Sequence, residues 1–155
     1  MYKSGAKQYQ SVNTTSEVLD ADPHRLIQLL MEGALTRMAQ AKGSIQRGDF
    51  AEKSRLLSRV NDIMQTLQSS LDHTQGGVLA ANLDGLYDYM IRRTLEAGNR
   101  NDLDMIDEVM GLLLQVKTGW DGIRQDYLQS VHGVSSSSNS NHNPEEVRLS
   151  GNVSA

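Results

Sequence analysis

Apolar residues recur every three or four positions along four separate segments of this 155-residue chain. This spacing aligns them on one stripe of an α-helix, because the helix turns once in 3.6 residues. No segment keeps the two-residue alternation of a half-buried strand. The pattern therefore predicts four amphipathic helices. Their stripes are Ile27, Leu30, Ala34, Met38, Ala41 and Ile45; Leu57, Val60, Met64, Leu67 and Leu71; Leu79, Leu83, Leu86, Met90 and Ala97; and Ile106, Val109, Leu113, Val116, Trp120, Ile123 and Tyr127.

Capping residues mark the ends of these segments. Asp22 before Pro23 predicts a helix start, because Asp caps free N–H groups and Pro has no N–H to leave unbonded. Asp49 with Glu52 three residues later is typical of a capping box. The first three helices are expected to end at Gly48, Gly76–Gly77 and Gly98–Asn99, and Asn101 or Asp102 to cap the fourth.

Short connections between long helices favour antiparallel neighbours. We therefore expect an all-α fold, an antiparallel up-down four-helix bundle over residues 22–131. Residues 1–21 are of mixed polar character and form an N-terminal cap segment. Residues 132–155 are rich in Ser and Asn and carry too little apolar surface to offset the entropy of ordering, so they are expected to be a disordered tail.

The sequence offers no set of residues suited to catalysis or metal binding. The chain has no cysteine, which excludes disulfides and thiolate metal sites. A di-iron bundle needs Glu-x-x-His pairs on one helix face, and none occurs. The four histidines, His24, His73, His132 and His142, lie near helix ends or in the tail and are expected to be solvated or capping. We therefore predict no enzyme, no cofactor and no metal.

Charge and hydropathy restrict the partners and the compartment. The net charge is −4, and the Arg92–Arg93 pair does not extend into the basic stripe that nucleic-acid binding needs. No apolar run approaches the roughly 20 residues of a membrane helix. The first residues also lack the apolar core of a secretory signal. These features favour a cytoplasmic protein with no nucleic-acid partner and no stable membrane insertion.

Some apolar residues fall outside the predicted core stripes. On the third helix, Tyr87, Ile91 and Leu95 form a second, narrower strip, with Ile91 and Leu95 about 110–150° from the stripe centre. Asp84 and Asp88 share that side, which indicates that it is not buried in the bundle.

The first helix has a similar excess at Leu26 and Leu29, and Gly33 leaves a dent where another backbone could lie close. Irregular packing, in which these residues cover one another, is one interpretation. A second is that residues 2–12, with Tyr2, Tyr9 and Val12, fold back over a strip. A third is a groove for a partner's segment. The residues alone leave these alternatives open.

The third helix also resembles a known family. Asn82–Leu83, the run from Leu86 to Arg93, and Ala97 resemble the signature of the flagellar export chaperones of the FliS family. Residues 22–26, 32–35, 71–72 and 101–120 continue the likeness in order, over about residues 1–128 in total. Departures occur at Met31, Glu32 and Thr94, where the family usually has an aromatic residue, Asp and often Leu.

The resemblance implies a cytosolic, non-enzymatic chaperone in flagellar type III secretion. Such a protein binds the disordered C-terminal region of flagellin, prevents premature polymerisation and helps deliver flagellin to a component of the export gate. It implies partner contacts at the two surplus apolar sets, first Tyr87, Ile91 and Leu95 and then Leu26, Leu29 and Gly33. Tyr2, Tyr9 and Val12 then form a lid that flagellin displaces, and Trp120 is read as core.

Two other classes of function stay possible at this point. One is a helical adaptor or dimerisation module without a flagellin client, which gel filtration distinguishes from a monomer that binds its client one to one. The other is a metal-binding bundle, which elemental analysis tests.

Overall fold

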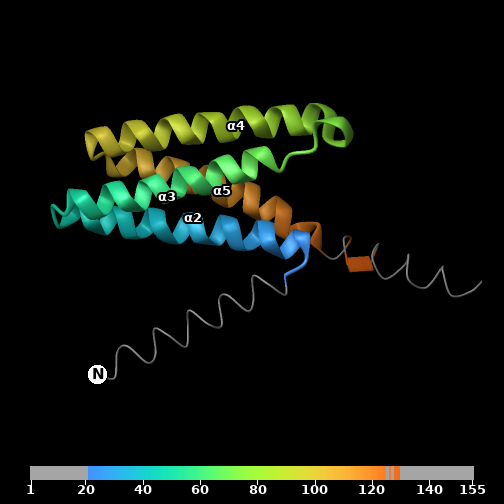
Figure 1. Cartoon of the computed structure of the whole chain (residues 1–155), viewed down its shortest axis with the longest axis horizontal. Helices are drawn as coiled ribbons and strands as arrows, with labels where there is room; N and C mark the ends of the chain where they lie inside the picture. Colours follow the sequence, from blue (N-terminus) through green and yellow to red (C-terminus); the bar gives the residue numbers. More distant parts are fainter. Residues whose placement is uncertain (1–20, 125, 127, 130–155) are drawn as a thin grey trace, which may run out of the picture. The chain divides into compact units, whose positions relative to one another are not determined.

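The computed structural model describes residues 21–124, 126, 128 and 129, and they form helices joined by short turns. The helices are α2 (Pro23–Gln46), α3 (Phe50–Ser69), α4 (His73–Arg100) and α5 (Leu103–Gly122) (Figure 1). No strand occurs among the described residues. The expected all-α fold is confirmed. Residues 1–20 of the predicted cap segment, Tyr2, Tyr9 and Val12 with them, and the predicted tail 132–155 lie outside the described residues.

The four helices form an antiparallel bundle, with consecutive helices running in opposite directions (Figure 1). α2 packs along α3, and α3 packs along α4. Ion pairs tie α5 to the helices on either side of it. Arg93 Nε of α4 lies 2.9 Å from Glu108 Oε2, and Lys117 Nζ lies 3.7 Å from Glu32 Oε1 of α2. The predicted up-down four-helix bundle is therefore confirmed.

Aspartates cap three of the helices as expected. The Asp22 side chain accepts a hydrogen bond from the Arg25 N–H at 2.7 Å, next to Pro at the first position of α2. The Asp102 side chain accepts one from the Met105 N–H at 3.1 Å. These caps satisfy N–H groups that have no partner inside the helix, which is why the helix starts were predictable from local sequence.

The cap of α3 differs in one detail from the predicted capping box. Asp49 accepts from the Glu52 N–H at 3.2 Å, but its own N–H donates to the Ser44 carbonyl at 2.8 Å. The Glu52 carboxylate pairs with Arg55 instead. Half of the box forms, because the preceding helix already supplies an acceptor for the second N–H.

The Gly76–Gly77 pair does not end the second helix, which corrects the prediction. α3 ends at Ser69, and Asp72 then caps α4 by accepting from the Gln75 N–H at 3.0 Å. α4 breaks at Gly77, whose φ of 51° and ψ of −124° lie outside the helical region, and resumes after it. Its C-terminal end is at Arg100, with Asn101 in the left-handed conformation at φ 53°, two residues beyond the predicted Gly98.

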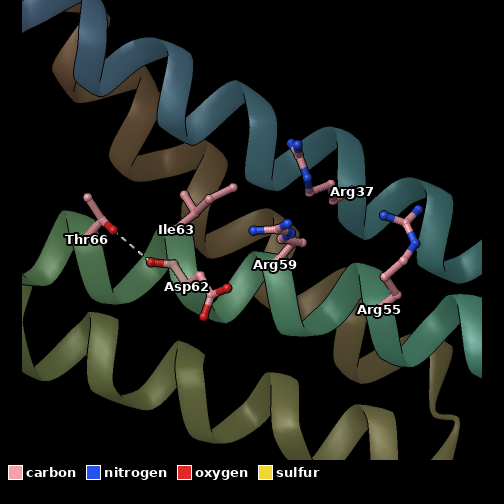
Figure 2. Close-up of a pocket in the computed structure, with 6 residues that line it drawn as sticks. All are labelled: Arg37, Arg55, Arg59, Asp62, Ile63 and Thr66. Carbon is pink, nitrogen blue, oxygen red and sulfur yellow. Dashed lines mark hydrogen bonds between the residues drawn. The ribbon is translucent and has the colours of Figure 1, made fainter.

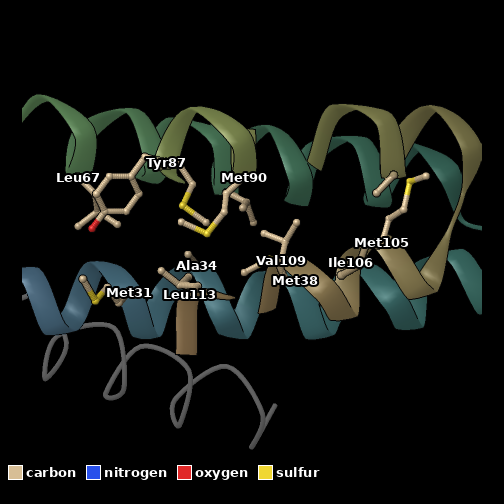
Figure 3. Close-up of a cluster of buried hydrophobic side chains, with 13 residues drawn as sticks. Met31, Ala34, Met38, Leu67, Tyr87, Met90, Met105, Ile106, Val109 and Leu113 are labelled. Carbon is tan, nitrogen blue, oxygen red and sulfur yellow. The ribbon is translucent and has the colours of Figure 1, made fainter. Parts of the chain in front are cut away.

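Among the described residues, the main hydrophobic cluster of the core contains 13 buried residues drawn from all four helices (Figure 3). Five of them are methionines, whose unbranched side chains fill irregular gaps between helices. They are Met31, Ala34, Met38, Val60, Met64, Leu67, Tyr87, Met90, Ala97, Met105, Ile106, Val109 and Leu113.

The buried face of α4 is rotated from the predicted stripe. Leu79 was predicted to be in the core but is 67% exposed, whereas Tyr87 and Thr94 are buried. The Thr94 hydroxyl donates to the Met90 carbonyl at 2.7 Å, so its polar group is satisfied inside the helix and it tolerates burial. The predicted stripe left out Thr94 because it is polar and included Leu79 because it is apolar. Both choices turned the predicted stripe away from the face of α4 that is buried.

Candidate partner-binding grooves

A groove of about 380 Å³ runs between α3 and α4. Two hydrogen bonds across it set the antiparallel register. Lys53 Nζ donates to the Gly98 carbonyl at 2.7 Å, and Gln68 Nε2 donates to the Asp84 carbonyl at 3.3 Å. The groove lies between these two ties. Its lining residues are Lys53, Ser54, Leu57, Ser58, Asn61, Asp62 and Gln65 of α3 and Ile91, Thr94, Leu95, Gly98 and Asn99 of α4.

Two residues of the predicted strip on α4 line this groove. Leu95 is 56% exposed, and Ile91 is half-buried with part of its side chain packed against the core. Both lie beside Leu57 of α3 in the groove lining. The groove therefore presents apolar side chain to solvent along its α4 wall.

Tyr87 does not belong to this exposed strip. It is 3% exposed and lies among the core side chains in Figure 3. Burial raises the pKa of its hydroxyl above the ordinary value of 10.0. The expectation that Tyr87 lies on an unburied side of the helix is wrong, because the core face of α4 is centred nearer to it than the sequence stripe implied.

A second groove, between α2 and α3, is basic. Figure 2 shows Arg37 of α2 and Arg55 and Arg59 of α3 along it, with Ile63 beside them. Arg55 is paired with Glu52, whose pKa is lowered from 4.5 by that hydrogen bond.

Of the second predicted set, on α2, Gly33 lies beside this basic groove. Arg37 Nη1 donates to the Gly33 carbonyl at 3.1 Å. A Cβ atom on Gly33 would lie 3.1 Å from that nitrogen and 3.8 Å from Ile63 Cδ1, so the predicted dent is already occupied. Leu26 is 38% exposed and Leu29 is half-buried. The α3–α4 groove is thus the more apolar of the two candidate surfaces.

Comparison with known proteins identifies the family. The family model described as "Flagellar protein FliS" matches residues 5–127. This chain belongs to the FliS family. The match spans all four helices, and the resemblance inferred from the sequence is confirmed.

Three relatives illustrate how close this FliS-family chain is to others. It is 53% identical to the flagellar secretion chaperone FliSB of Pseudomonas aeruginosa over 117 residues, which is 76% of this chain and 93% of the relative. It is 43% identical to the flagellar secretion chaperone FliS of Salmonella typhimurium over 118 residues, 76% of this chain and 87% of the relative. It is 31% identical to the FliS of Bacillus subtilis over 128 residues, 83% and 90% of the two chains.

Two buried polar residues of this FliS-family protein were missed by the sequence reasoning. Lys53 is 9% exposed, and its ammonium donates to both Gly98 O and Asn101 Oδ1 at 2.7 Å. Asn61 is also 9% exposed. Both fall on the three- and four-residue spacing of the α3 stripe, so the spacing carried a signal that their polarity concealed.

The aromatic residues at the bundle end also differ from expectation. His24 was expected to be solvated or capping but is 2% exposed and stacks on Trp120. Trp120 was expected to be a core residue. It is partly buried and packs against the main core cluster. Tyr89 is 36% exposed, and its hydroxyl donates to the Glu108 carboxylate.

In the part of the FliS-family chain that the structure describes, no three His, Asp or Glu side chains lie close enough together to hold a metal ion. Within the same residues, no helix combines the length and apolarity needed to cross a bilayer.

Proposed function

We propose that this chain is a cytosolic, non-enzymatic export chaperone that binds the disordered C-terminal region of flagellin. It prevents premature polymerisation and helps deliver flagellin to the flagellar type III export apparatus through an export-gate component. The observation that carries the proposal is the α3–α4 groove with its exposed Leu95, in a chain whose relatives are named flagellar secretion chaperones.

The groove suits an apolar segment of chain. Leu95 of α4 is 56% exposed, and Ile91 and Leu57 continue the apolar lining beneath it. Complete burial of one large apolar side chain in the complex contributes about 1.5–3 kcal/mol to the free energy of binding. Polar residues such as Ser54, Ser58 and Gln65 line the rest of the groove and fix the position of a bound backbone.

The partner contacts follow from this placement. Ile91 and Leu95 form the primary contact surface, while Tyr87 supports it from the core. A client that wraps around the bundle makes secondary contacts on α2, at Leu26, Leu29 and Gly33. This surface is secondary because it exposes less apolar side chain than the α3–α4 groove does at Leu95.

Calorimetry with flagellin tests the function. The chain is titrated with flagellin of the same organism, intact and lacking its C-terminal segment. We expect one-to-one binding to the intact form only. Leu95→Asp is expected to weaken binding at least tenfold, about 1.4 kcal/mol. Leu114→Asp is the matched control. Leu114 is 53% exposed on α5, and its replacement by Asp adds the same charge as Leu95→Asp.

Each outcome of this titration decides a different point. Binding that is insensitive to Leu95→Asp keeps the function and moves the site away from the α3–α4 groove. Absence of binding to either flagellin contradicts the function. A helical adaptor or dimerisation module then becomes the better description, and gel filtration showing a stable dimer supports it.

The N-terminal segment is proposed to act as a lid. Tyr2, Tyr9 and Val12 are apolar or aromatic residues in an otherwise polar stretch, suited to cover an apolar groove until the client displaces them. A lid that occupies the site lowers apparent affinity by the fraction of time the site is covered. A variant lacking residues 1–15 should therefore bind flagellin more tightly. Equal affinity of the two forms would contradict the lid.

A further inference from the structure

Asn61 stands out in the α3–α4 groove because its side-chain oxygen has no hydrogen-bond donor. The residue is 9% exposed, so 91% of its surface is buried. Among the residues that the structure describes, Asn61 Oδ1 is the one fully buried side-chain polar atom without a partner. Buried polar atoms are almost always hydrogen-bonded, so an orphan acceptor at a groove requires an explanation.

Two of the donors that line the groove, on Thr94 and Lys53, are bonded elsewhere. The register set by Lys53 opposite Gly98 and Gln68 opposite Asp84 brings Asn61 level with Met90 and Ile91. The Thr94 hydroxyl, on the α4 wall of the groove, donates its single proton to the Met90 carbonyl at 2.7 Å.

The Lys53 ammonium is engaged at the far end of the groove, with Gly98 O and Asn101 Oδ1. The amide oxygen of Asn61 therefore stays without a donor, on the same stripe of α3 as the apolar residues Leu57, Val60 and Met64.

We infer that Asn61 recognises the backbone of the segment bound in the groove, an inference that rests on the proposed function. A carboxamide carries an acceptor and two donors, which match the N–H and C=O of one residue in an extended chain, because these two groups point to the same side. Rotation of the terminal amide is soft, so a partial turn brings Oδ1 from the interior to the groove edge when a donor arrives.

This chemistry specifies the conformation of the occupant. Peptide groups inside a helix are already bonded to one another, so a helical segment has no free N–H for Asn61 except at its first turn. The occupant at this level is an extended stretch of the client, with apolar side chains on Ile91 and Leu95 and the N–H and C=O of one residue on Asn61.

The substitution Asn61→Leu separates recognition from structure, because Leu has nearly the same shape and no hydrogen-bonding groups. Leu relieves the orphan acceptor, so the urea midpoint of the free protein is expected to stay the same or rise. Binding of the synthetic C-terminal flagellin peptide, measured by calorimetry, is expected to weaken at least fivefold. Gln115→Leu is the matched control, since Gln115 is an exposed amide on α5 outside this groove, and it should change binding less than twofold.

An ester scan of the peptide identifies the partner atom. Each backbone amide in turn is replaced by an ester, which removes one N–H and keeps the chain shape. With wild-type protein, one ester is expected to weaken binding at least fivefold and its neighbours less than twofold. With Asn61→Leu, that ester should have no further effect, because both changes remove the same hydrogen bond. The wild-type scan is decisive even if Asn61→Leu does not fold.

The outcomes separate this inference from the function on which it rests. If wild-type protein does not bind the peptide or intact flagellin, the proposed function fails and the inference fails with it. If the wild type binds, and Asn61→Leu binds equally well or no single ester stands out, the inference alone is overturned and Asn61 has no part in recognition.

Discussion

The imidazole of His24 stacks on the indole of Trp120, with ring centroids 4.5 Å apart and ring planes 7° from parallel. The two residues also exchange hydrogen bonds with each other's backbone. His24 Nε2 donates to the Trp120 carbonyl at 2.7 Å, and Trp120 Nε1 donates to the His24 carbonyl at 3.0 Å. This pair joins the first turn of α2 to the end of α5 and so closes the bundle between its first and last described helices.

Removing the indole donor should loosen this closure. Trp120→Phe keeps an aromatic ring against His24 but removes the indole N–H that donates to the His24 carbonyl. We expect a loss of about 1–2 kcal/mol in the free energy of unfolding, from the hydrogen bond and part of the stacking. Urea denaturation followed by circular dichroism measures it. An unchanged urea midpoint would show that the pair contributes nothing to stability.

The buried ammonium of Lys53 should matter more than surface cations do. Lys53→Met keeps most of the side-chain volume and removes both hydrogen bonds to the end of α4. The expected loss is about 1–3 kcal/mol, because Gly98 O and Asn101 Oδ1 lose a charged donor. Arg92→Met is the control: Arg92 is 69% exposed in its pair with Asp88, and such pairs contribute about 0–1 kcal/mol. Equal effects of the two changes would contradict the role assigned to Lys53.

Two glycines of α4 should respond to alanine with opposite signs. Gly77 has φ +51° and ψ −124°, which a residue with a Cβ atom adopts only with strain. Gly77→Ala is expected to cost about 1–3 kcal/mol. Gly85 lies in the helix with nothing within 4 Å of an added Cβ, so Gly85→Ala is expected to stabilise by about 0.5–1 kcal/mol. Thermal or urea unfolding of both variants checks the signs, and a tolerated Gly77→Ala would mean that the break in α4 can be rebuilt as regular helix.

Acidification should weaken the bundle as two carboxylates on α5 become protonated. Hydrogen bonds from Tyr89 and then Arg93 lower the pKa of Glu108 below its ordinary 4.5. A hydrogen bond from Lys117 lowers the pKa of Asp121 below its ordinary 3.8, opposed by burial and aided by Gln28. A pKa that is lower in the folded state gives stability that is present above the unfolded value and is lost as pH falls through the folded value.

The measurement is urea denaturation across about pH 3 to pH 7. The free energy of unfolding should be flat near neutrality and decline below the ordinary pKa values of 4.5 and 3.8. The decline should be modest, since both groups are near the surface and screened. Glu108→Gln should reduce the acid-dependent loss. An identical decline in that variant would show that Glu108 is not among the groups responsible.

Local sequence predicted the helices because their signals are local. Asp22, Asp49 and Asp102 each bond an N–H three residues ahead, an interaction that needs no distant partner. The predicted stripe of α3 likewise lies in the core from Leu57 to Leu67. Part of the candidate site followed from the same reasoning, since Ile91 and Leu95 line the α3–α4 groove.

The placement of polar residues could not be predicted in this way. Thr94 tolerates burial because its hydroxyl is satisfied within the helix, and Tyr87 is buried as well. The dent expected at Gly33 is filled by Arg37, one turn away, whose guanidinium donates to the Gly33 carbonyl. Residue type alone does not state whether a polar group finds a partner.

The sequence by itself determined that this chain forms four amphipathic helices, where most of them begin, and to which family it belongs. These properties depend on spacing, caps and residue order within single segments. Only the tertiary structure decided which face of α4 is buried, that His24 stacks on Trp120, and that Lys53 and Asn61 lie buried beside one groove. Each of these depends on the rotation and register of one helix against another, which are set by packing between segments far apart in the chain.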